Sequence, residues 1–454
     1  MESRDDLAVL AQRRTRSLIE FAIARSPFYR DLYAGVPRAA LDLSRLPVVQ
    51  KKELMGAFDR VLTEPRVRRA AVEDFIGDPR NVGQPFAGEY AVWTSSGTSG
   101  VPGIFLHDTD ALSVYDMLQF FRFRGASSWM DWSAGPLCTT RYALVAVTGG
   151  HFAGEGAIMR LRSLLPWMQQ RLGIFTLMQP LASLVSGLNA FQPDFLATYP
   201  TVAAMLAREQ QEGRLRIRPA QIWTGAECLS PATRALLGDV FNAVVREEYG
   251  ASEFASIAAE CAAGRLHVNA DWVVLEPVDA AFEPVKPGET SHTVLLTNLA
   301  NRVQPLIRYD LGDSVKIGTI PCACGVPLPT ITVQGRADDL LELPARAGGC
   351  VRLAPLVLTT ILEEGAGLWD FQLEQTGPAA VRLHVGTPGP GVAERATTVL
   401  GNYFADQGIA EVRIDVDEMP PRREGQGAKL RRVLTAPGTR PGPGPCYIAQ
   451  DAGH

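Results

Sequence analysis

Short β-rich runs alternate with helical stretches between residues 92 and 250, and this alternation limits the chain to few architectures. Strands that alternate with helices form layered α/β units around a largely parallel sheet, because each connecting helix covers a face of the sheet. The sequence therefore predicts an α/β fold class for a large N-terminal domain. The clearest expected strands are Phe195–Tyr199, Gln221–Thr224 and Val244–Glu248, and the clearest expected helix is Thr201–Glu212.

Three other regions show different patterns. Apolar residues at helical spacing predict an amphipathic helix or helix pair over Leu7–Tyr33. Strand and turn patterns over 267–316 predict a small β-rich subdomain. An α-β-β-α-β order over 356–416 predicts a small α+β lid with one antiparallel sheet. The expected organisation is a nucleotide- and acid-binding N-terminal domain, a mobile C-terminal lid domain and an irregular Pro/Gly-rich tail, at residues 1–336, 337–436 and 437–454.

Composition excludes several classes of function. The 454 residues carry a net charge of −5 and no cluster of basic residues, so neither nucleic acid nor an anionic membrane is expected as a principal partner. No apolar run approaches the roughly 18 residues of a spanning helix, and the acidic N-terminus has no signal-peptide pattern. We expect a cytoplasmic protein. Seven cysteines, an odd number, argue against a disulfide scaffold.

The strongest local signal is the Ser/Gly-rich segment Thr94-Ser-Ser-Gly-Thr-Ser-Gly-Val-Pro-Gly103, directly after the apolar Tyr90–Trp93. Small hydroxyl residues interleaved with glycines let backbone N–H groups and hydroxyls converge on phosphate oxygens. The segment is not a Walker A loop, because no GK[ST] follows at the right distance. Taken alone, an ordinary Ser/Gly turn is an equally good interpretation.

This segment resembles the phosphate loop of the adenylate-forming superfamily, which includes acyl- and aryl-CoA ligases, peptide-synthetase adenylation domains and luciferases. Six matches in the family's order are far more specific than any single one. The pattern is most similar to the phenylacetate–CoA ligase branch, including F390-synthetase-like members, on the Ser-rich loop, Tyr199-Pro200-Thr201 and a compact C-terminal domain. The other five matches are Thr224-Gly-Ala-Glu227, Tyr249-Gly-Ala-Ser-Glu253, Arg308–Asp313, Gly335–Asp339 and Gly427–Arg432.

The resemblance implies an ATP-dependent ligase that converts a small, aromatic carboxylic acid to its acyl-AMP and then forms a thioester with coenzyme A. It implies ATP and Mg²⁺ as cofactors. Catalysis is assigned to Thr98, Glu253 and Lys429, acid binding to His151, Tyr199, Pro200 and Ala251, and the hinge to Asp338. Nucleotide binding is assigned to Ser95, Ser96, Gly97, Thr98, Ser99, Gly100, Gly225, Ala226, Glu227, Tyr249, Gly250, Ala251, Ser252, Asp313 and Arg336.

These roles agree with elementary chemistry. Adenylation brings two anions together, so positioning and electrostatic stabilisation carry the step. Glu253 suits Mg²⁺, which takes few protein carboxylates. Asp313 can accept two ribose O–H bonds, and Lys429 brings charge when the lid closes. Two positions depart from the family pattern, which often has lysine at Gly103 and has glycine at Ala428.

The acid pocket is less defined. His151 lies where the superfamily places a gate near the substrate carboxylate, and it could donate to that group; a packing histidine is the equal alternative. Tyr199 and Pro200 resemble one wall. The other walls come from stretches such as 139–147 and 253–257, so the polarity of the pocket stays open.

A separate constellation combines Cys261-x5-His267 with Cys322-Ala-Cys324. Three thiolates and one imidazole form a closed tetrahedral set typical of structural zinc. Some members of the phenylacetate–CoA ligase branch carry such a site, which supports the prediction. The alternative is three reduced cysteines and a surface histidine.

Two further functions stay open. The acyl acceptor could be a carrier-protein phosphopantetheine or an amine in place of coenzyme A. The chain could also be a non-catalytic nucleotide- or acyl-binding protein, although Glu253, Asp313 and Lys429 argue against this. Assembly as a homodimer is likewise open.

Overall fold

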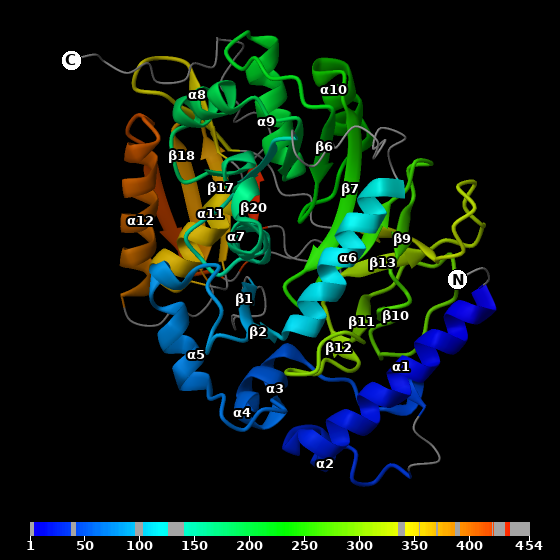
Figure 1. Cartoon of the computed structure of the whole chain (residues 1–454). Helices are drawn as coiled ribbons and strands as arrows, with labels where there is room; N and C mark the ends of the chain where they lie inside the picture. Colours follow the sequence, from blue (N-terminus) through cyan, green and yellow to red (C-terminus); the bar gives the residue numbers. More distant parts are fainter. Residues whose placement is uncertain are drawn as a thin grey trace.

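The computed structural model describes residues 4–37, 42–95, 103–125, 140–334, 341–353, 355–368, 371–385, 391–419, 421 and 432–435. Its centre is a nine-stranded sheet with the order β13-β14-β9-β8-β7-β6-β5-β3-β4. Helices flank this sheet, and the elements of the C-terminal region lie at one side of it (Figure 1). The nine strands are β3 (Tyr142–Ala146), β4 (Leu172–Thr176), β5 (Phe195–Thr198), β6 (Gln221–Thr224), β7 (Val244–Ala251), β8 (Phe254–Glu260), β9 (Leu266–Val268), β13 (Ser314–Ile317) and β14 (Thr330–Gln334).

The half of this sheet from β4 to β7 is parallel, as the alternating sequence pattern predicts. In register, Thr198 of β5 lies beside Thr224 of β6, which lies beside Glu247 of β7. The carboxyl ends of these three strands therefore meet at one edge, where open α/β sheets bind their ligands. The connecting helices are α7 (Ala153–Leu164), α8 (Leu181–Phe191), α9 (Pro200–Gln211) and α10 (Pro231–Phe241).

The sheet changes direction after β7. Ala251 pairs with Phe254, so Ser252 and Glu253 form a two-residue turn, and β8 returns antiparallel to β7. β9, β14 and β13 continue the antiparallel half. The expected β-rich region thus consists of this extension and a separate three-stranded sheet. That sheet contains β10 (Val273–Val278), β11 (Thr293–Asn298) and β12 (Tyr309–Asp310).

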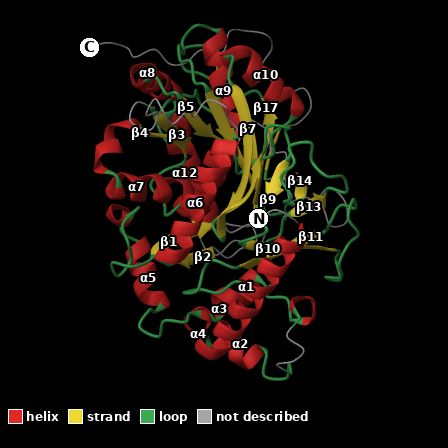
Figure 2. Cartoon of the chain, turned by 45° about the vertical axis from the view of Figure 1, so that its right-hand side comes forward, coloured by secondary structure: helices red, strands yellow, loops and turns green. Residues whose placement is uncertain are grey.

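A hairpin carries the Ser/Gly-rich segment. β1 (Ala91–Ser95) pairs antiparallel with β2 (Gly103–His107), with Ser95 opposite Gly103, so the segment connects the two strands. α6 (Thr109–Gly125) follows β2 and lies alongside β7 in both cartoon views (Figures 1 and 2). The expected N-terminal helix pair is present as α1 (Arg4–Arg25) and α2 (Pro27–Leu32). The short helices α3 (Lys51–Gly56), α4 (Phe58–Val61) and α5 (Arg69–Ile76) follow it.

The described C-terminal elements form a four-stranded sheet with the order β19-β18-β17-β20. The prediction of an antiparallel sheet here is wrong: β17 and β18 are antiparallel, but β19 and β20 lie parallel to their neighbours. A helix joins β18 to β19 and returns the chain to the starting end, which makes those strands parallel. The elements are β15 (Leu341–Pro344), β16 (Cys350–Leu353), α11 (Pro355–Thr360), β17 (Phe371–Gly377), β18 (Ala380–Val385), α12 (Val392–Asp406), β19 (Arg413–Asp417) and β20 (Val433–Thr435).

Two buried apolar clusters hold these layers together. One lies between the N-terminal helices, the β1–β2 hairpin and the antiparallel strands. The other runs without interruption from the parallel strands and α8–α9 into the C-terminal sheet, with Leu184 and Leu206 on one side and Phe371 and Leu400 on the other. The C-terminal region therefore rests against the parallel half of the sheet through an apolar contact.

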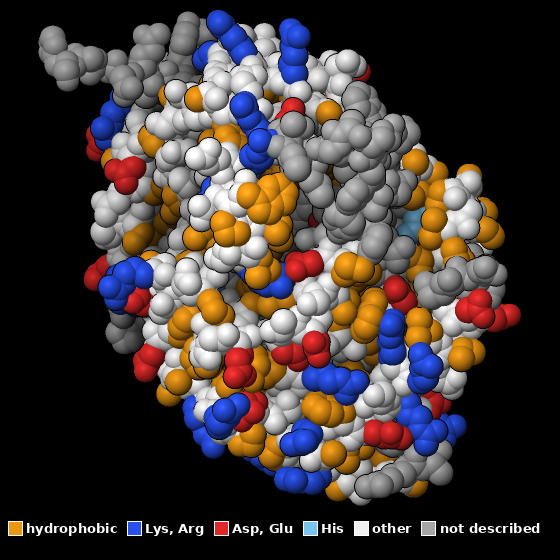
Figure 3. All heavy atoms as spheres, in the orientation of Figure 1, with side chains coloured by type: hydrophobic (Ala, Val, Ile, Leu, Met, Phe, Trp, Pro, Cys, Tyr) orange, Lys and Arg blue, Asp and Glu red, His pale blue; other side chains and the backbone are white. Residues whose placement is uncertain are grey.

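The outer surface carries both signs of charge. Figure 3 shows Lys and Arg side chains interspersed with Asp and Glu side chains over the face that it presents. Among the described residues, no helix combines the length and the apolar character needed to cross a membrane.

Candidate functional site

The Ser252–Glu253 turn is fixed from three sides by buried hydrogen bonds. The Ser252 hydroxyl donates to the carbonyl of Thr94 on β1 (2.8 Å). His107 Nε2 contacts the Ser252 carbonyl (2.9 Å), and Asn298 Nδ2 donates to the Glu253 carbonyl (2.9 Å). Burial lowers the pKa of His107 to about 3, so the ring is neutral and its Nε2–H donates. The turn is therefore attached to both strands of the hairpin that carries the Ser/Gly-rich segment.

Glu253 is a buried carboxylate with partners that suit a cation site. Only 5% of the residue is exposed, and the Tyr309 hydroxyl donates to Oε1 (3.0 Å). Burial raises the pKa of Glu253, whereas the positive charge of Lys51 and the bond from Tyr309 act in the opposite direction. The backbone N–H of Glu253 also donates to this carboxylate.

Lys51 supplies a cation at the base of the hairpin. Its Nζ donates to Ser95 Oγ (2.9 Å). Gly103 faces Ser95 across the hairpin, and a Cβ on Gly103 would lie 2.8 Å from Lys51 Cε and 2.6 Å from Ser95 Oγ. The glycine that departs from the family pattern therefore leaves the space that Lys51 occupies.

The position of Lys51 depends on a local strand bridge. Val49 pairs with Tyr309, through hydrogen bonds from Val49 N to the Arg308 carbonyl (3.0 Å) and from Asp310 N to the Val49 carbonyl (2.9 Å). Lys51 then begins α3, so the same bridge fixes this lysine and the tyrosine that binds Glu253.

Asp313 lies on the opposite side of β7. The Tyr249 hydroxyl donates to Asp313 Oδ2 (2.8 Å), and burial beside this carboxylate raises the pKa of Tyr249 well above its usual range. The bond fixes the orientation of the Asp313 carboxylate. The Tyr249–Glu253 motif thus connects the β1–β2 hairpin at one end with Asp313 at the other.

Glycine is required within this motif. A Cβ on Gly250 would lie 2.0 Å from the Ala255 carbonyl oxygen, where no side chain fits. The chain forms a bulge there, between Tyr249 and Ala251. Close approach of the two arms of the hairpin therefore explains the glycine of the Tyr249–Glu253 motif.

The segment after β6 approaches the same edge. Gly225 N donates to the Thr198 carbonyl (3.3 Å), and Ala226 has a left-handed backbone (φ 64°) that non-glycine residues rarely adopt. The Glu227 carboxylate accepts hydrogen bonds from Thr201 N (3.1 Å) and Thr201 Oγ1 (3.0 Å). Its side chain thereby caps the start of α9.

The residues predicted to bind the acid form two groups. Tyr199 precedes Pro200, the first residue of α9, and its hydroxyl accepts a hydrogen bond from Val147 N (3.3 Å). His151 is buried against Phe75, and its carbonyl accepts a bond from Thr94 N (2.7 Å). Burial lowers the pKa of His151 and favours the neutral ring.

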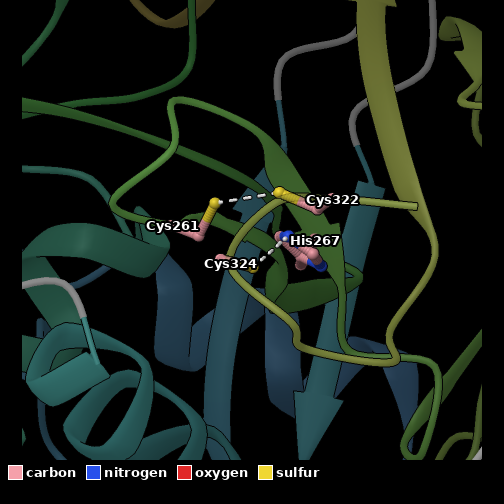
Figure 4. A group of neighbouring side chains, drawn as sticks. All are labelled: Cys261, His267, Cys322 and Cys324. Carbon is pink, nitrogen blue, oxygen red and sulfur yellow. Dashed lines mark hydrogen bonds between the residues drawn. The ribbon is translucent and has the colours of Figure 1, made fainter. Parts of the chain in front are cut away.

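Four side chains predicted to bind zinc lie together (Figure 4). Cys261 follows β8, His267 lies in β9, and Cys322 and Cys324 lie in the loop before β14. The four donor atoms lie within 4.8 Å of one another. Cys261 Sγ is 3.6 Å from Cys322 Sγ, and Cys324 Sγ is 3.3 Å from His267 Nε2.

This arrangement fits a tetrahedral zinc ion. Bonds of about 2.3 Å place neighbouring donors about 3.8 Å apart, close to the separations found here. His267 Nδ1 contacts the Leu328 carbonyl (3.0 Å), so Nδ1 carries the proton and Nε2 faces the sulfurs. Backbone N–H groups of Cys324 and Val326 donate to the sulfurs of Cys322 and Cys324. Four protein ligands fill the coordination sphere, as in structural sites.

Several predicted site residues lie outside the described part of the chain. They are Ser96, Gly97, Thr98, Ser99, Gly100, Arg336, Asp338 and Lys429. Their roles stay predictions. Ser95 ends β1, and Ala251 ends β7 as a half-buried residue.

Four side chains at the site were not predicted: Lys51, His107, Asn298 and Tyr309 all contact the residues of the two phosphate-side motifs. Two of them left a signal in the sequence: Lys51, because the chain has five lysines among 44 basic residues, and Tyr309, which lies within the Arg308–Asp313 match. His107 and Asn298 act through backbone carbonyls, which no motif records.

Comparison with known proteins gives relatives over most of the chain. No family model matches. A phenylacetate–coenzyme A ligase of Thermus thermophilus is 25% identical over 359 residues, which are 74% of this chain and 72% of that protein. The protein CapK of Staphylococcus aureus is 30% identical over 135 residues, which are 29% of this chain and 28% of that protein.

Solved structures show the same fold. A 2-hydroxyisobutyryl-CoA ligase with 2-HIB-AMP and CoA in the thioesterification state gives a TM-score of 0.60 at 20% identity, covering 96% of this chain and 90% of that one. Its open conformation gives 0.55 at 20% identity, covering 93% and 90%. The resemblance to the adenylate-forming superfamily is confirmed, as is its mixed α/β fold with a large N-terminal and a smaller C-terminal domain.

Replacing Lys51 with Met should raise the Kd for MgATP at least about tenfold, the usual effect of losing one hydrogen bond to a charged group. Isothermal titration calorimetry measures this. Lys52→Met is the matched control, because Lys52 is the next residue of α3 and is exposed. Equal effects of the two substitutions would contradict the assignment of Lys51.

Cys322→Ser should release bound zinc and lower the yield and the Tm of the folded protein together, because structural zinc contributes on the order of 10 kcal/mol to folding. Elemental analysis and thermal denaturation measure the two effects. Cys228→Ser is the control, since Cys228 lies outside the four-residue cluster and contacts the Val333 carbonyl. A folded Cys322→Ser protein that keeps the wild-type Tm would eliminate the zinc site.

Proposed function

We propose that this chain is an AMP-forming acid–thiol ligase. In the first half-reaction an oxygen of the substrate carboxylate attacks the α-phosphorus of ATP. The bond from the α-phosphorus to the bridging oxygen breaks, and pyrophosphate leaves with the electron pair. In the second half-reaction the thiol of coenzyme A attacks the acyl carbon, AMP leaves, and the thiol proton passes to solvent.

The observation that carries the proposal is the convergence of the separate motifs around β7. Ser95 and Lys51 lie at the base of the phosphate-loop hairpin, and the Ser252–Glu253 turn is hydrogen-bonded to that hairpin. Asp313 is reached from the same strand through Tyr249. A nucleotide with its phosphates near Ser95 and its ribose near Asp313 would occupy the carboxyl edge of the parallel strands, where such sheets bind ligands.

The described residues have definite tasks in the first half-reaction. Asp313 accepts hydrogen bonds from the ribose hydroxyls. The Lys51 ammonium lies where it neutralises phosphate charge, and the peptide groups of the Ser252–Glu253 turn are fixed before the substrate binds. Preorganised groups of this kind stabilise a transition state without reorganisation during the reaction.

Glu253 suits the Mg²⁺ that accompanies ATP, because it is a buried carboxylate that the Tyr309 hydroxyl orients beside the hairpin of the Ser/Gly-rich segment. The ion would supply positive charge to the phosphate oxygens. A structural zinc ion that joins the ends of the antiparallel extension would be held by Cys261, His267, Cys322 and Cys324. With four protein ligands that zinc has no place in the reaction.

An aromatic acid and coenzyme A are the favoured substrates, on the similarity to the phenylacetate–coenzyme A ligase. A carrier protein or an amine as acceptor is the alternative. The resemblance also implies that the C-terminal domain turns about Asp338 between the half-reactions, and that Lys429 faces the α-phosphate only during adenylation.

We expect acid-dependent exchange of pyrophosphate into ATP, and a higher rate of AMP formation when coenzyme A is added. The assay uses a panel of aryl and alkyl acids with purified protein and Mg²⁺. Exchange without any response to coenzyme A would favour a carrier-protein or amine acceptor. No exchange with any acid would contradict an adenylating activity.

Lys429→Ala should slow adenylation at least about 100-fold, as the loss of one transition-state donor does in other enzymes. Thioester formation from preformed acyl-AMP should change much less, because the domain then presents another face. Single-turnover assays of each half-reaction measure the two rates. Equal losses in both would contradict this role for Lys429.

A further inference from the structure

Three residues line up across the carboxyl edge of the parallel strands. The register Thr198–Thr224–Glu247 places the next residues, Tyr199, Gly225 and Glu248, in a row on the opposite face of the sheet. Tyr199 keeps extended backbone angles (φ −82°, ψ 148°), so its side chain continues the alternation of β5.

The middle member of this row has no side chain. Gly225 lies directly against the backbone of β7, since a Cβ there would be 3.1 Å from the Glu248 carbonyl oxygen. Strand spacings of about 4.8 Å separate Tyr199 from Glu248 by about 10 Å. The Gly225 backbone thus forms a floor with the Tyr199 ring on one side and the Glu248 carboxyl group on the other.

Glu248 is a buried carboxyl group that the scaffold satisfies only in part. Its neighbours by hydrogen bond are Ser256 and Gln119, which are both neutral, and burial raises the pKa of Glu248 to about 7. Oε1 is screened from solvent and has no hydrogen-bond partner among the described residues. The residue as a whole is half-buried.

This carboxyl group has no task in the nucleotide site. Tyr249, the next residue, points to Asp313, and alternation along β7 directs Glu248 to the face along which α6 runs, where Gln119 lies. Ser256 belongs to the stretch 253–257, which the sequence places in the wall of the acid pocket. Tyr199, the opposite wall, was likewise assigned to the acid. Glu248 therefore makes one wall of the expected acid pocket polar. The sequence motifs had left the polarity of this pocket open.

We propose that Glu248 recognises a hydrogen-bond donor on the substrate, so that the activated acid carries an amino or hydroxyl group at the end remote from its carboxylate. The inference rests on the proposed function. Ala251, at the turn, lies three positions after Glu248, about 10 Å along an extended chain, so the donor lies well away from the reacting carboxylate.

The physical reason is that leaving a buried acceptor unpaired costs more free energy than a typical hydrogen bond contributes. The terminal torsion of a glutamate is broad, so a small rotation turns Oε1 toward a ligand over Gly225. A donor on the ligand would satisfy this oxygen. A hydrocarbon acid of the same shape would leave it buried and unpaired, and sites of this kind reject the analogue that lacks the donor.

The test is pyrophosphate exchange with benzoic and phenylacetic acids substituted at the 3- or 4-position with hydroxyl, amino, aminomethyl or methyl. We expect kcat/KM for at least one donor-bearing acid to exceed that of its methyl analogue at least about tenfold. Glu248→Leu should shift this ratio at least about tenfold toward the methyl acid. Glu248→Gln keeps an acceptor oxygen without the charge, so it should retain hydroxyl acids and lose any preference for the cationic aminomethyl acids.

Glu247→Gln is the matched control, because Glu247 is the neighbouring carboxylate on the other face of β7 and accepts a hydrogen bond from Leu229 N (3.4 Å). It should leave every ratio unchanged. Methyl acids activated as well as donor-bearing acids by the wild type would overturn the inference. A Glu248→Gln variant that keeps a wild-type preference for aminomethyl acids would also overturn it, even where Glu248→Leu does not fold. No exchange with any acid would remove the proposed function instead.

Discussion

The two-residue turn at Ser252 and Glu253 is the constraint on which the site depends. At this turn the sheet changes from parallel to antiparallel, so the turn lies at the edge where the parallel strands end. Buried bonds from His107 and Asn298 hold both carbonyls of the turn, and Ser252 holds the hairpin in return. A fully satisfied buried network of this kind favours one geometry, because each lost bond leaves a buried group unpaired. The topology of the sheet thus fixes where Glu253 lies before any ligand binds.

Close packing explains why three positions of the site are glycines. Gly250 allows the arms of the β7–β8 hairpin to approach each other, Gly103 leaves room for Lys51, and Gly225 brings β6 against β7. None of the three glycines has a left-handed backbone. Each is therefore explained by the lack of room for a side chain, and not by the chain conformation. Gly103 shows this most clearly, because a departure from the family pattern coincides with a cation that comes from a different segment. Lys51 thus brings a positive charge beside Ser95, at the base of the hairpin that is proposed to bind phosphate.

The sequence was informative wherever a local pattern decides the structure. Strand and helix alternation predicted the parallel half of the sheet, and residue spacing with the family resemblance predicted that Cys261, His267, Cys322 and Cys324 lie together. Pairing between distant segments was not predictable in the same way. Lys51 reaches Ser95 from 44 residues away through the bridge of Val49 to Tyr309. The sheet of the C-terminal region was predicted wrongly for a related reason. Two of its pairings, β17 with β20 and β18 with β19, are parallel, and no tight turn joins the strands of either pair.

Buried polar groups divide this protein into scaffold and binding surface. His107, Asn298 and Gln304 are buried and bond to neighbouring side chains or carbonyls, and Gln304 also holds β2 through Leu106 N (2.7 Å) and the Ile104 carbonyl (3.1 Å). Glu248 is different, because one of its carboxyl oxygens is buried and has no hydrogen-bond partner among the described residues. An unpaired buried acceptor is costly for folding, so it persists where a ligand completes it. Glu248 lies in β7 and Glu253 in the turn that ends it, so one strand positions both the carboxylate proposed to bind a cation and the one proposed to select the substrate.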